Sequence, residues 1–317
     1  MWRCRPVNKP LLVIAGASGI VGRSLIEAAG TRYRIRVLSS SSRGALSGVE
    51  TIAWNPTAAR QGDEQQVARV AEALTGAQAL VNLAGASIEG GRFNAAHRSR
   101  IYDSRIDSTT TLVAGFRRSA APPRAWLQAS GIHFYGDRGD ELLDEKASKG
   151  QGFLADMCEA WEGAVEPVRG HARVVACRFG LVLASEAPLW RRLVTPIKLG
   201  VGGRLGTGRQ WWSWICAEDL SRALLYLIEQ DGGEGSYNLS APEPVTQIEL
   251  FRALAQRLRR PAFFPAPAPL LRVVLGGAAD ALVLASTRVV PAKLQREGFE
   301  FRRPTVSEVL DKLVPSR

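Results

Sequence analysis

Three regularly spaced glycines near the N-terminus are the first residues whose arrangement suggests chemistry. Gly16, Gly19 and Gly22 follow an apolar run over 11–15 and open a helical pattern over 20–29. In such a turn the first glycine permits a tight bend, the second lets the backbone approach a pyrophosphate, and the third lets helix and strand pack closely. The pattern predicts a dinucleotide site, with a ligand-free glycine turn as the alternative. The residues expected at its phosphates are Gly16, Ser18, Gly19, Ile20, Val21 and Gly22.

The segment after the second expected strand indicates which dinucleotide binds. It contains Ser39, Ser40 and Arg43, and no carboxylate occurs before Glu50. A carboxylate there would accept hydrogen bonds from the adenosine ribose, whereas hydroxyls and an arginine suit a 2′-phosphate. We therefore expect NADP(H) to be preferred over NAD(H) by roughly 10- to 100-fold. The alternative is a polar loop whose Arg43 faces water.

Apolar runs of strand length alternate with helical patterns over the first 180 residues, and these elements must position the glycine turn. Strands are expected over 11–15, 35–38, 51–54, 79–83, 126–129 and 174–178, and helices over 20–29, 65–74, 94–118 and 153–168. Such alternation predicts a parallel sheet with right-handed crossovers. The expected fold is a Rossmann-like, doubly wound α/β domain over 1–185.

The pattern changes after residue 185. Glycine and tryptophan concentrate between Trp190 and Trp214, followed by helical patterns over 218–229 and 248–259, a possible last strand over 237–239 and a helical tail. We expect residues 186–317 to form a smaller, mainly helical portion on the substrate side. The segment from Gly202 to Trp212 is expected either to wall an anionic, partly planar ligand or to be a structural loop.

Composition excludes several classes of protein. The chain has 317 residues, of which 46% are hydrophobic and 22% charged, as in a soluble globular protein. The 41 basic residues exceed the 30 acidic ones, but the 35 arginines are spread from end to end. No zinc-finger, helix-turn-helix or aromatic RNA-binding pattern accompanies them, so we expect no specific nucleic-acid partner.

Cysteine and histidine usage points to a reducing compartment and no metal. The four cysteines and three histidines are scattered, with no C-x-x-C pair. Their spacing assembles no zinc site and no disulfide framework. The apolar stretch over 269–285 is interrupted by charges and glycines, so no membrane span is expected. The expected location is the cytoplasm.

Several motifs together resemble the extended short-chain dehydrogenase/reductases, the NAD-dependent epimerase/dehydratase superfamily. Within it the chain is similar to atypical members called epimerase family proteins, which carry their own C-terminal domain of unknown function. That domain would cover about 262–315. The motifs are the glycine turn, Asn82-Leu-Ala-Gly85, Arg100-Ile-Tyr-Asp-Ser-Arg105, Gln128-Ala-Ser-Gly-Ile-His-Phe-Tyr-Gly136, Tyr135-Gly-Asp-Arg-Gly-Asp140, Gly208-Arg-Gln-Trp-Trp-Ser-Trp214, Asn238-Leu-Ser-Ala-Pro-Glu-Pro244 and Ala285-Ser-x-Arg-Val-Val-Pro291.

The resemblance implies further cofactor contacts. The segment after the fourth strand would lie against the central part of the cofactor, and the segment after the sixth strand would pass near the nicotinamide. Arg105, on the long helix, would reach a cofactor phosphate or the substrate, or lie on an exposed helix face. The residues implied are Leu83, Ala84, Gly85, Arg105, Phe179, Gly180 and Val182. A homodimer through the helices over 94–118 and 153–168 is expected on the same ground.

The chain departs from the superfamily in its catalytic pair. Ordinary members place Tyr-x-x-x-Lys on the helix after the serine strand, where the lysine lowers the tyrosine pKa. Here Phe153 and Met157 occupy those positions, and no tyrosine lies between Gly136 and Gly170. The remaining candidates are Ser130, to orient a substrate oxygen, and Tyr135 or Cys158, to exchange the proton. Each also has a structural interpretation. Ser130 can cap the backbone, Tyr135 can be a packed aromatic ring, and Cys158 can be a small buried hydrophobic residue.

Two classes of function follow from these features. The first is an NADP(H)-dependent oxidoreductase, similar to a nucleotide-sugar epimerase, acting on an unidentified small molecule. The second is a non-catalytic NADP(H)-binding sensor or regulatory protein. Loss of the Tyr–Lys pair favours the sensor, whereas Ser130 and the segment over 190–214 favour the enzyme.

Overall fold

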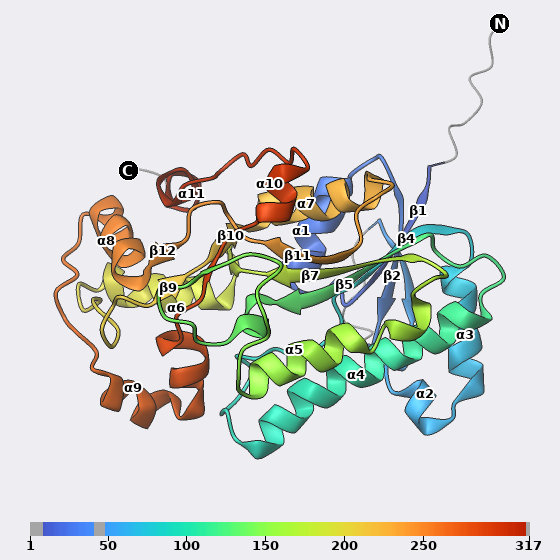
Figure 1. Ribbon diagram of the computed structural model, residues 1–317, viewed down its shortest axis with the longest axis horizontal. Coiled ribbons are helices and arrows are strands. Elements are labelled where there is room, and N and C mark those ends of the chain that lie inside the picture. Colours follow the sequence, from blue (N-terminus) through green and yellow to red (C-terminus); the bar gives the residue numbers. More distant parts are fainter. Residues whose placement is uncertain (1–8, 41–47, 315–317) are drawn as a thin grey trace, which may run out of the picture.

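A seven-stranded parallel sheet forms the centre of the computed structural model, which describes residues 9–40 and 48–314 (Figure 1). The strand order is that of a Rossmann sheet extended by one strand. The strands, in spatial order, are β11 (Gly235–Leu239), β7 (Arg173–Phe179), β5 (Ala125–Gly131), β4 (Ala77–Asn82), β1 (Leu11–Ala15), β2 (Arg34–Ser39) and β3 (Glu50–Ala53). The predicted fold class is confirmed.

Helices cover both faces of this sheet, which explains why its central strands are apolar throughout. Side chains of β1 alternate between two cores, with Leu12 and Ile14 on one face and Leu11 and Val13 on the other. The first core is closed by α1 (Ile20–Ala29), α7 (Ala217–Glu229) and α10 (Ala292–Arg296). The opposite face carries α2 (Ala58–Gln61), α3 (Glu64–Leu74), α4 (Ala95–Arg118) and α5 (Phe153–Gly163).

Expected and observed elements agree closely in the first 180 residues. The long helix begins after Asn94, whose side chain accepts a hydrogen bond from the backbone N–H of His97 as an N-cap. The helix expected over 153–168 is shorter: α5 ends at Gly163 and a 3-10 turn, Glu166–Val168, follows. Pro167 lies in that turn and has no N–H to continue an α-helix, which accounts for the difference.

The C-terminal portion builds a separate core beside the sheet. Its helices α6 (Pro188–Lys198), α8 (Gln247–Leu258) and α11 (Val306–Leu313) enclose Trp190, Trp214 and Phe251. Two short strand pairs connect it to the sheet domain: β8 (Leu181–Leu183) with β10 (Trp214–Cys216), and β6 (Leu142–Leu143) with β13 (Arg288–Val289). Another pair, β9 (Trp211–Trp212) with β12 (Val245–Thr246), lies within the C-terminal portion. Because β11 belongs to the main sheet, residues beyond 185 complete that sheet. The boundary at 185 stays a prediction.

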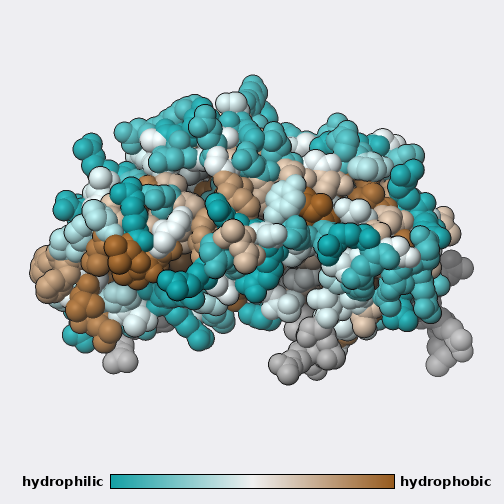
Figure 2. Space-filling model, turned by 90° about the horizontal axis from the view of Figure 1, so that it is seen from below, coloured by the Kyte–Doolittle hydropathy of each residue, from teal (hydrophilic) through white to brown (hydrophobic). Residues whose placement is uncertain are grey.

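One arm of the C-terminal portion is unusually exposed and apolar. It consists of α9 (Ala268–Leu275) and the π-helical segment η4 (Ala279–Leu284), and we call it the α9–η4 arm. Leu270 is 52% exposed and Val273 83% exposed. Figure 2 shows hydrophobic side chains gathered at the end of the molecule where α9 lies. Within 9–40 and 48–314, no helix is long and apolar enough to cross a bilayer.

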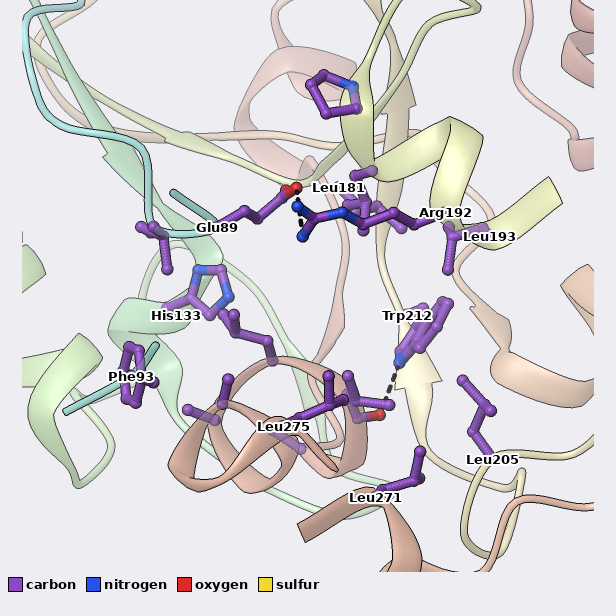
Figure 3. A pocket seen from close by; sticks show the side chains of 18 of the residues that line it. Glu89, Phe93, His133, Leu181, Arg192, Leu193, Leu205, Trp212, Leu271 and Leu275 are labelled. Atoms are coloured by element: carbon purple, nitrogen blue, oxygen red, sulfur yellow. Dashed lines mark hydrogen bonds and ion pairs between the residues drawn. The ribbon is translucent and has the colours of Figure 1, made fainter. Parts of the chain in front are cut away.

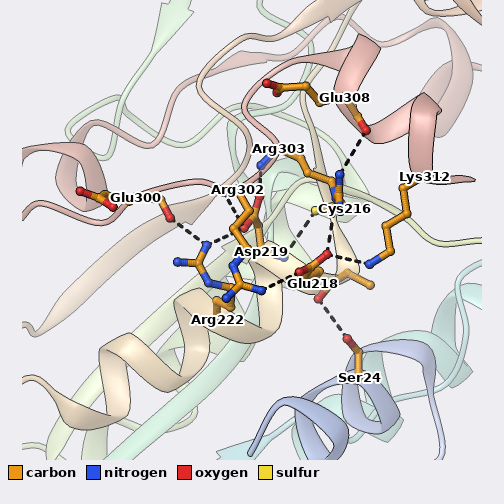
Figure 4. Close-up of polar contacts among 11 residues, drawn as sticks. Ser24, Cys216, Glu218, Asp219, Arg222, Glu300, Arg302, Arg303, Glu308 and Lys312 are labelled. Carbon is orange, nitrogen blue, oxygen red and sulfur yellow. Dashed lines mark hydrogen bonds and ion pairs between the residues drawn. The ribbon is translucent and has the colours of Figure 1, made fainter.

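A cluster of charged residues ties the C-terminal segment to the first turn of α7 (Figure 4). Glu218 accepts from Lys312 at 2.6 Å and from Arg302 at 2.9 Å. Asp219 accepts from the backbone N–H groups of Arg302 and Arg303. Both acids also face the positive end of the helix dipole. Lys312, followed by Arg302, lowers the pKa of Glu218 from 4.5 to about 2, against the effect of burial.

We expect Glu218→Gln to lower the free energy of unfolding at pH 7 by about 1 to 2 kcal/mol, a value reduced for partial exposure. Because the pKa is depressed in the folded state, this stabilisation is present above about pH 4.5 and is lost as the pH falls to about 2. Urea unfolding of wild type and variant at pH 7 and pH 3 measures it. Glu166→Gln, at an exposed Arg169 pair, is the control, with an expected change under about 0.5 kcal/mol. Equal losses in the two variants would contradict the prediction.

Candidate active site

Strands β1, β2, β4, β5 and β7 end at the same, carboxyl edge of the sheet, where the parallel register brings Ala15 level with Leu38 and Asn82. In open α/β sheets, ligands bind in the crevice at this edge. Within the described residues, most of the cofactor contacts predicted from the sequence lie at or just after these strand ends or in the first turn of α1. Val182 lies on β8, and Arg105 lies in the middle of α4.

The glycine turn has one position where the fold does not itself require glycine. Gly16 has φ of +80°, and a Cβ there would lie 2.7 Å from the backbone of Ala84. A Cβ on Gly22 would lie 2.4 Å from Ala17. A Cβ on Gly19, by contrast, would meet only one backbone oxygen, at 4.0 Å. The first and third glycines therefore serve packing, whereas the second leaves open a space that suits a closely approaching pyrophosphate.

The start of α1 suits an anion. Gly19 is its N-cap and offers no side chain to the first N–H groups, and the first turn carries no acidic residue. Asn94 and Thr246 cap α4 and α8 with their side chains, whereas α5 and α6, like α1, have no side-chain N-cap. Unpaired N–H groups at a helix start, with the helix dipole behind them, attract phosphate oxygens.

The segment expected to select the 2′-phosphate is described only in part. Ser39 ends β2 half-buried, with its carbonyl accepting from the N–H of Trp54, and Ser40 is exposed beside it. Arg43 lies outside the described residues. The NADP(H) preference of this segment stays a prediction from the sequence.

The segment after β4 is held by buried polar contacts. The Asn82 side-chain amide donates to Thr109 and Gln128 at 3.0 Å, and its Oδ1 accepts from the backbone N–H of Ala84. Arg105 is buried and donates to the carbonyls of Ala86 and Ile101, while its Nε has no hydrogen-bond partner within the described residues. Burial lowers the Arg105 pKa to about 10. Arg105 thus shapes the cofactor-side backbone, and its expected contact with a ligand stays a prediction.

A cavity of about 1130 Å³ opens between this edge and the α9–η4 arm (Figure 3). Three of the predicted cofactor residues line it, namely Ile20, Gly180 and Val182. Trp211 and Trp212 also line it, as the predicted substrate wall requires, but Arg204 and Arg209 are not among the lining residues that the structure describes. The cavity therefore adjoins the expected nicotinamide end without the two arginines that suggested an anionic ligand.

His133 is the titratable side chain that the sequence analysis missed. It lies in the 3-10 turn Ile132–Tyr135 after β5, and its ring points into the cavity (Figure 3). Within the described part of the chain the ring makes no hydrogen bond. Burial, and then the Arg105 charge, lower the His133 pKa from 6.5 to about 4. The ring is therefore neutral at physiological pH, with one N–H to donate and one nitrogen to accept.

Two of the three predicted catalytic residues, Ser130 and Tyr135, lie in a buried polar network, whereas Cys158 belongs to an apolar cluster. Ser130 donates to Glu162 at 2.6 Å, and Arg178 donates to both oxygens of Glu162 at 2.8 Å. Arg178 also donates to the Tyr135 hydroxyl at 3.0 Å, and that hydroxyl donates to Asn238 at 2.7 Å. Neither Ser130 nor Tyr135 is among the described residues that line the cavity.

Burial keeps Tyr135 and Cys158 in their neutral forms. The Tyr135 side chain is fully buried, and burial raises its pKa. Cys158 is buried on α5, and burial, then the Glu162 charge, raise its pKa to about 11. A thiol at such a pKa is not a reactive thiolate at neutral pH. The catalytic roles of Ser130, Tyr135 and Cys158 stay predictions, and this geometry favours structural ones.

The positions of the usual Tyr–Lys pair belong to an apolar cluster. Phe153 packs edge-on against Phe93 with ring centroids 5.9 Å apart, and Met157 is buried beside Leu154 and Trp161. The sequence could have identified His133 as a site residue, because His133 follows Ser130 by three residues, just after the end of a buried strand. The apolar arm carried no such signal, since only the tertiary fold brings it to this edge.

Ser130→Ala is expected to lower the free energy of unfolding by about 1.5 to 3 kcal/mol, because it removes a hydrogen bond to a buried carboxylate. Chemical denaturation at pH 7 measures the change. Ser240→Ala is the matched control, since Ser240 is fully buried and its hydroxyl has no hydrogen-bond partner in the described structure. We expect this control to be neutral or slightly stabilised. A Ser130→Ala protein as stable as Ser240→Ala would contradict the network role.

Comparison with known proteins agrees with this geometry. The NAD dependent epimerase/dehydratase family model matches residues 12–152, and a domain of unknown function (DUF1731) matches 266–313. An epimerase family protein of Mycobacterium leprae is 34% identical over 304 residues, covering 96% of this chain and 95% of that protein. A crystal structure of a human epimerase family protein with NADPH has a TM-score of 0.85 at 25% identity, covering 96% of this chain and 99% of that one.

A nucleoside-diphosphate sugar epimerase structure from Corynebacterium glutamicum has a TM-score of 0.76 at 28% identity, covering 98% of this chain and 59% of that one. The two family models thus cover the glycine turn and the α9–η4 arm of this chain. The resemblance seen in the sequence is confirmed: this chain belongs to the epimerase family, within the NAD dependent epimerase/dehydratase family.

Proposed function

We propose that the chain is an NADP(H)-dependent oxidoreductase acting on a small molecule bound in the cavity. The observation that carries the proposal is the open space at Gly19, at the start of an uncapped helix whose first residue, Ile20, also lines the cavity. The human relative crystallised with NADPH supports the choice of cofactor. Ser39, Ser40 and Arg43 support it independently, from the sequence.

In this proposal NADPH, when bound, would supply the hydride, solvent would supply the proton that the resulting alkoxide takes up, and side chains of the chain orient the substrate. Gly19 lets the backbone approach the pyrophosphate, and Gly180 and Val182 face the nicotinamide end. His133 donates its N–H to a carbonyl oxygen of the substrate. A neutral imidazole polarises a carbonyl without transferring a full charge, which suits a ring whose pKa is about 4. Phe93 and Trp212 line the cavity with aromatic rings.

The alternative is an NADP(H)-binding sensor without catalysis. The apolar cluster at the positions of the Tyr–Lys pair favours it. Against it stands the size of the cavity, since about 1130 Å³ beside the expected nicotinamide leaves room for a second molecule. A sensor needs no such space, so we favour the enzyme.

Two expectations from the sequence remain part of the proposal. α4 and α5 lie side by side on one face of the sheet, where the resemblance places a homodimer interface (Figure 1). The cysteines that the structure describes are Cys158, Cys177 and Cys216, all buried and free, which suits the proposed cytoplasmic location.

Gly19→Ala is expected to weaken NADPH binding by about tenfold or more, because its methyl group enters the space left for the pyrophosphate. Titration followed by nicotinamide fluorescence measures the dissociation constant. NADH is expected to bind the wild-type chain roughly 10- to 100-fold more weakly than NADPH. Gly163→Ala is the control, because its Cβ would also meet open space and its φ is not positive. Undiminished NADPH binding by Gly19→Ala would refute the site.

The buried neutral His133 predicts a pH dependence of stability. In the unfolded chain histidine takes up a proton near pH 6.5, whereas in the folded chain it does so near pH 4. The unfolded state therefore binds more protons between these values, and stability falls as the pH drops from about 6.5 to 4. The expected loss is about 2 to 3 kcal/mol.

Denaturant unfolding at pH 7.5 and pH 4.5 tests this dependence. His133→Asn should lack this component and so lose less stability on acidification than the wild type. His171→Asn, at an exposed histidine, should keep the wild-type difference. The prediction fails if His133→Asn and the wild type lose the same free energy between the two pH values.

A further inference from the structure

The uncharged polar side chains around the cavity are already engaged within the chain. Trp211 donates its Nε1 proton to a carboxylate at 2.7 Å, and Trp212 donates to a carbonyl of η4 at 3.3 Å. The hydroxyls of Ser213 and Thr287 each donate to backbone carbonyls at 2.9 to 3.1 Å. Asn94 caps α4. A ligand with many hydroxyl groups would find few partners among these groups.

The charged side chains of the cavity are equally unsuited to a phosphate. Glu89 and Arg192 face each other across the cavity, with a 3.8 Å contact between carboxylate and guanidinium (Figure 3). Arg92 also lines the cavity and is exposed, and among the described residues no carboxylate pairs with it. A nucleoside diphosphate placed here would find Arg92 as the single unpaired cation of the described lining. One exposed arginine is too little to compensate for burying a diphosphate, and burial of unpaired charge is strongly unfavourable.

The rest of the lining is apolar and comes from both portions of the chain. Strand β8 contributes Leu181, α6 contributes Leu189 and Leu193, and the segment after α6 contributes Leu205. The α9–η4 arm contributes Leu271, Leu275, Ala281 and Leu282. Apolar surface of this kind gains free energy by removing hydrocarbon from water. Among the lining residues that the structure describes, His133 contributes a neutral polar ring that makes no hydrogen bond within the chain.

We infer that the substrate is a lipophilic carbonyl compound, or the corresponding secondary alcohol, rather than a nucleotide sugar. Its hydrocarbon part packs against the α9–η4 arm, and its single oxygen accepts a hydrogen bond from His133. This inference rests on the proposed function for its reaction, but the binding chemistry stands on the cavity alone.

The entrance to the cavity has the same character as its interior. Val273 and Val274 line the cavity and are 83% and 70% exposed, so they form an apolar rim. The exposed hydrophobic patch in Figure 2 lies at this end of the molecule. Exposed patches of this kind often mark ligand-binding grooves. A lipophilic molecule passing this rim exchanges water for hydrocarbon contacts before it reaches His133.

Fluorescence of N-phenyl-1-naphthylamine, a neutral apolar probe, tests the inference on the full chain. The wild type should bind the probe with enhanced emission, and 2-decanone should displace it. UDP-glucose at the same concentrations should not. Displacement by UDP-glucose but not by 2-decanone would overturn the inference.

Two substitutions on α9 test whether the probe binds inside the cavity or on the outer hydrophobic patch. Leu275 lines the cavity, whereas Leu270, on the same helix and also exposed, is not among the lining residues described. Leu275→Asp should weaken probe binding at least about tenfold, because it puts a carboxylate into the apolar lining. Leu270→Asp should change it less than about twofold. Equal losses in both variants would place the probe on the outer patch and overturn the inference.

His133→Phe tests the polar contact separately. It should weaken 2-decanone binding by about three- to tenfold, as expected for one lost hydrogen bond, while leaving probe affinity within about twofold. Unchanged ketone affinity would overturn the role of His133. NADPH titration of the same proteins distinguishes the two proposals. A wild-type protein that binds NADPH but not the ketone refutes the substrate class alone. A wild-type protein that does not bind NADPH refutes the proposed function.

Discussion

The buried ion pair between Arg178 and Glu162 is the contact on which the floor of the site depends. Its guanidinium is 5% exposed and donates to both carboxylate oxygens at 2.8 Å. Burying two charges is unfavourable unless every remaining donor and acceptor is satisfied. Ser130 and Tyr135 meet that requirement, and the Phe134 ring covers the guanidinium with its centroid 3.4 Å from Cζ.

This network explains why polar residues near the catalytic positions need not be catalytic. β5, α5, β7 and β11 each contribute to it, so it fixes the edge of the sheet beneath the cavity. In ordinary superfamily members the Tyr–Lys pair comes from the helix that α5 matches. Here Phe153 and Met157 of that helix belong to an apolar cluster, and Glu162 of the same helix is bound by Arg178 and Ser130. The space above is left to an apolar lining and to His133.

The sequence was sufficient for the parts of this molecule that local patterns determine. The apolar run over 11–15, the glycine turn and the alternation of strands and helices placed the sheet and the start of α1. The end of α5 was missed by a few residues because Val165 and Val168 continue an apolar pattern through a 3-10 turn. The pairing of Ser130 with Glu162 was not visible, since it depends on how β5 and α5 pack rather than on spacing.

The lining of the substrate side could not be predicted from the sequence, for a different physical reason. The α9–η4 arm is more than 130 residues from His133 along the chain, and nothing local couples their chemistry. Arg204 and Arg209 suggested an anionic ligand because the sequence shows that two arginines are present but not whether they line the cavity. A cofactor site built by strand ends can stay constant while a separate C-terminal segment supplies the opposite wall. Exchange of that wall alone then changes the ligand from a polar to an apolar one, because the charge and hydrogen-bonding capacity of the lining decide which molecule can leave water.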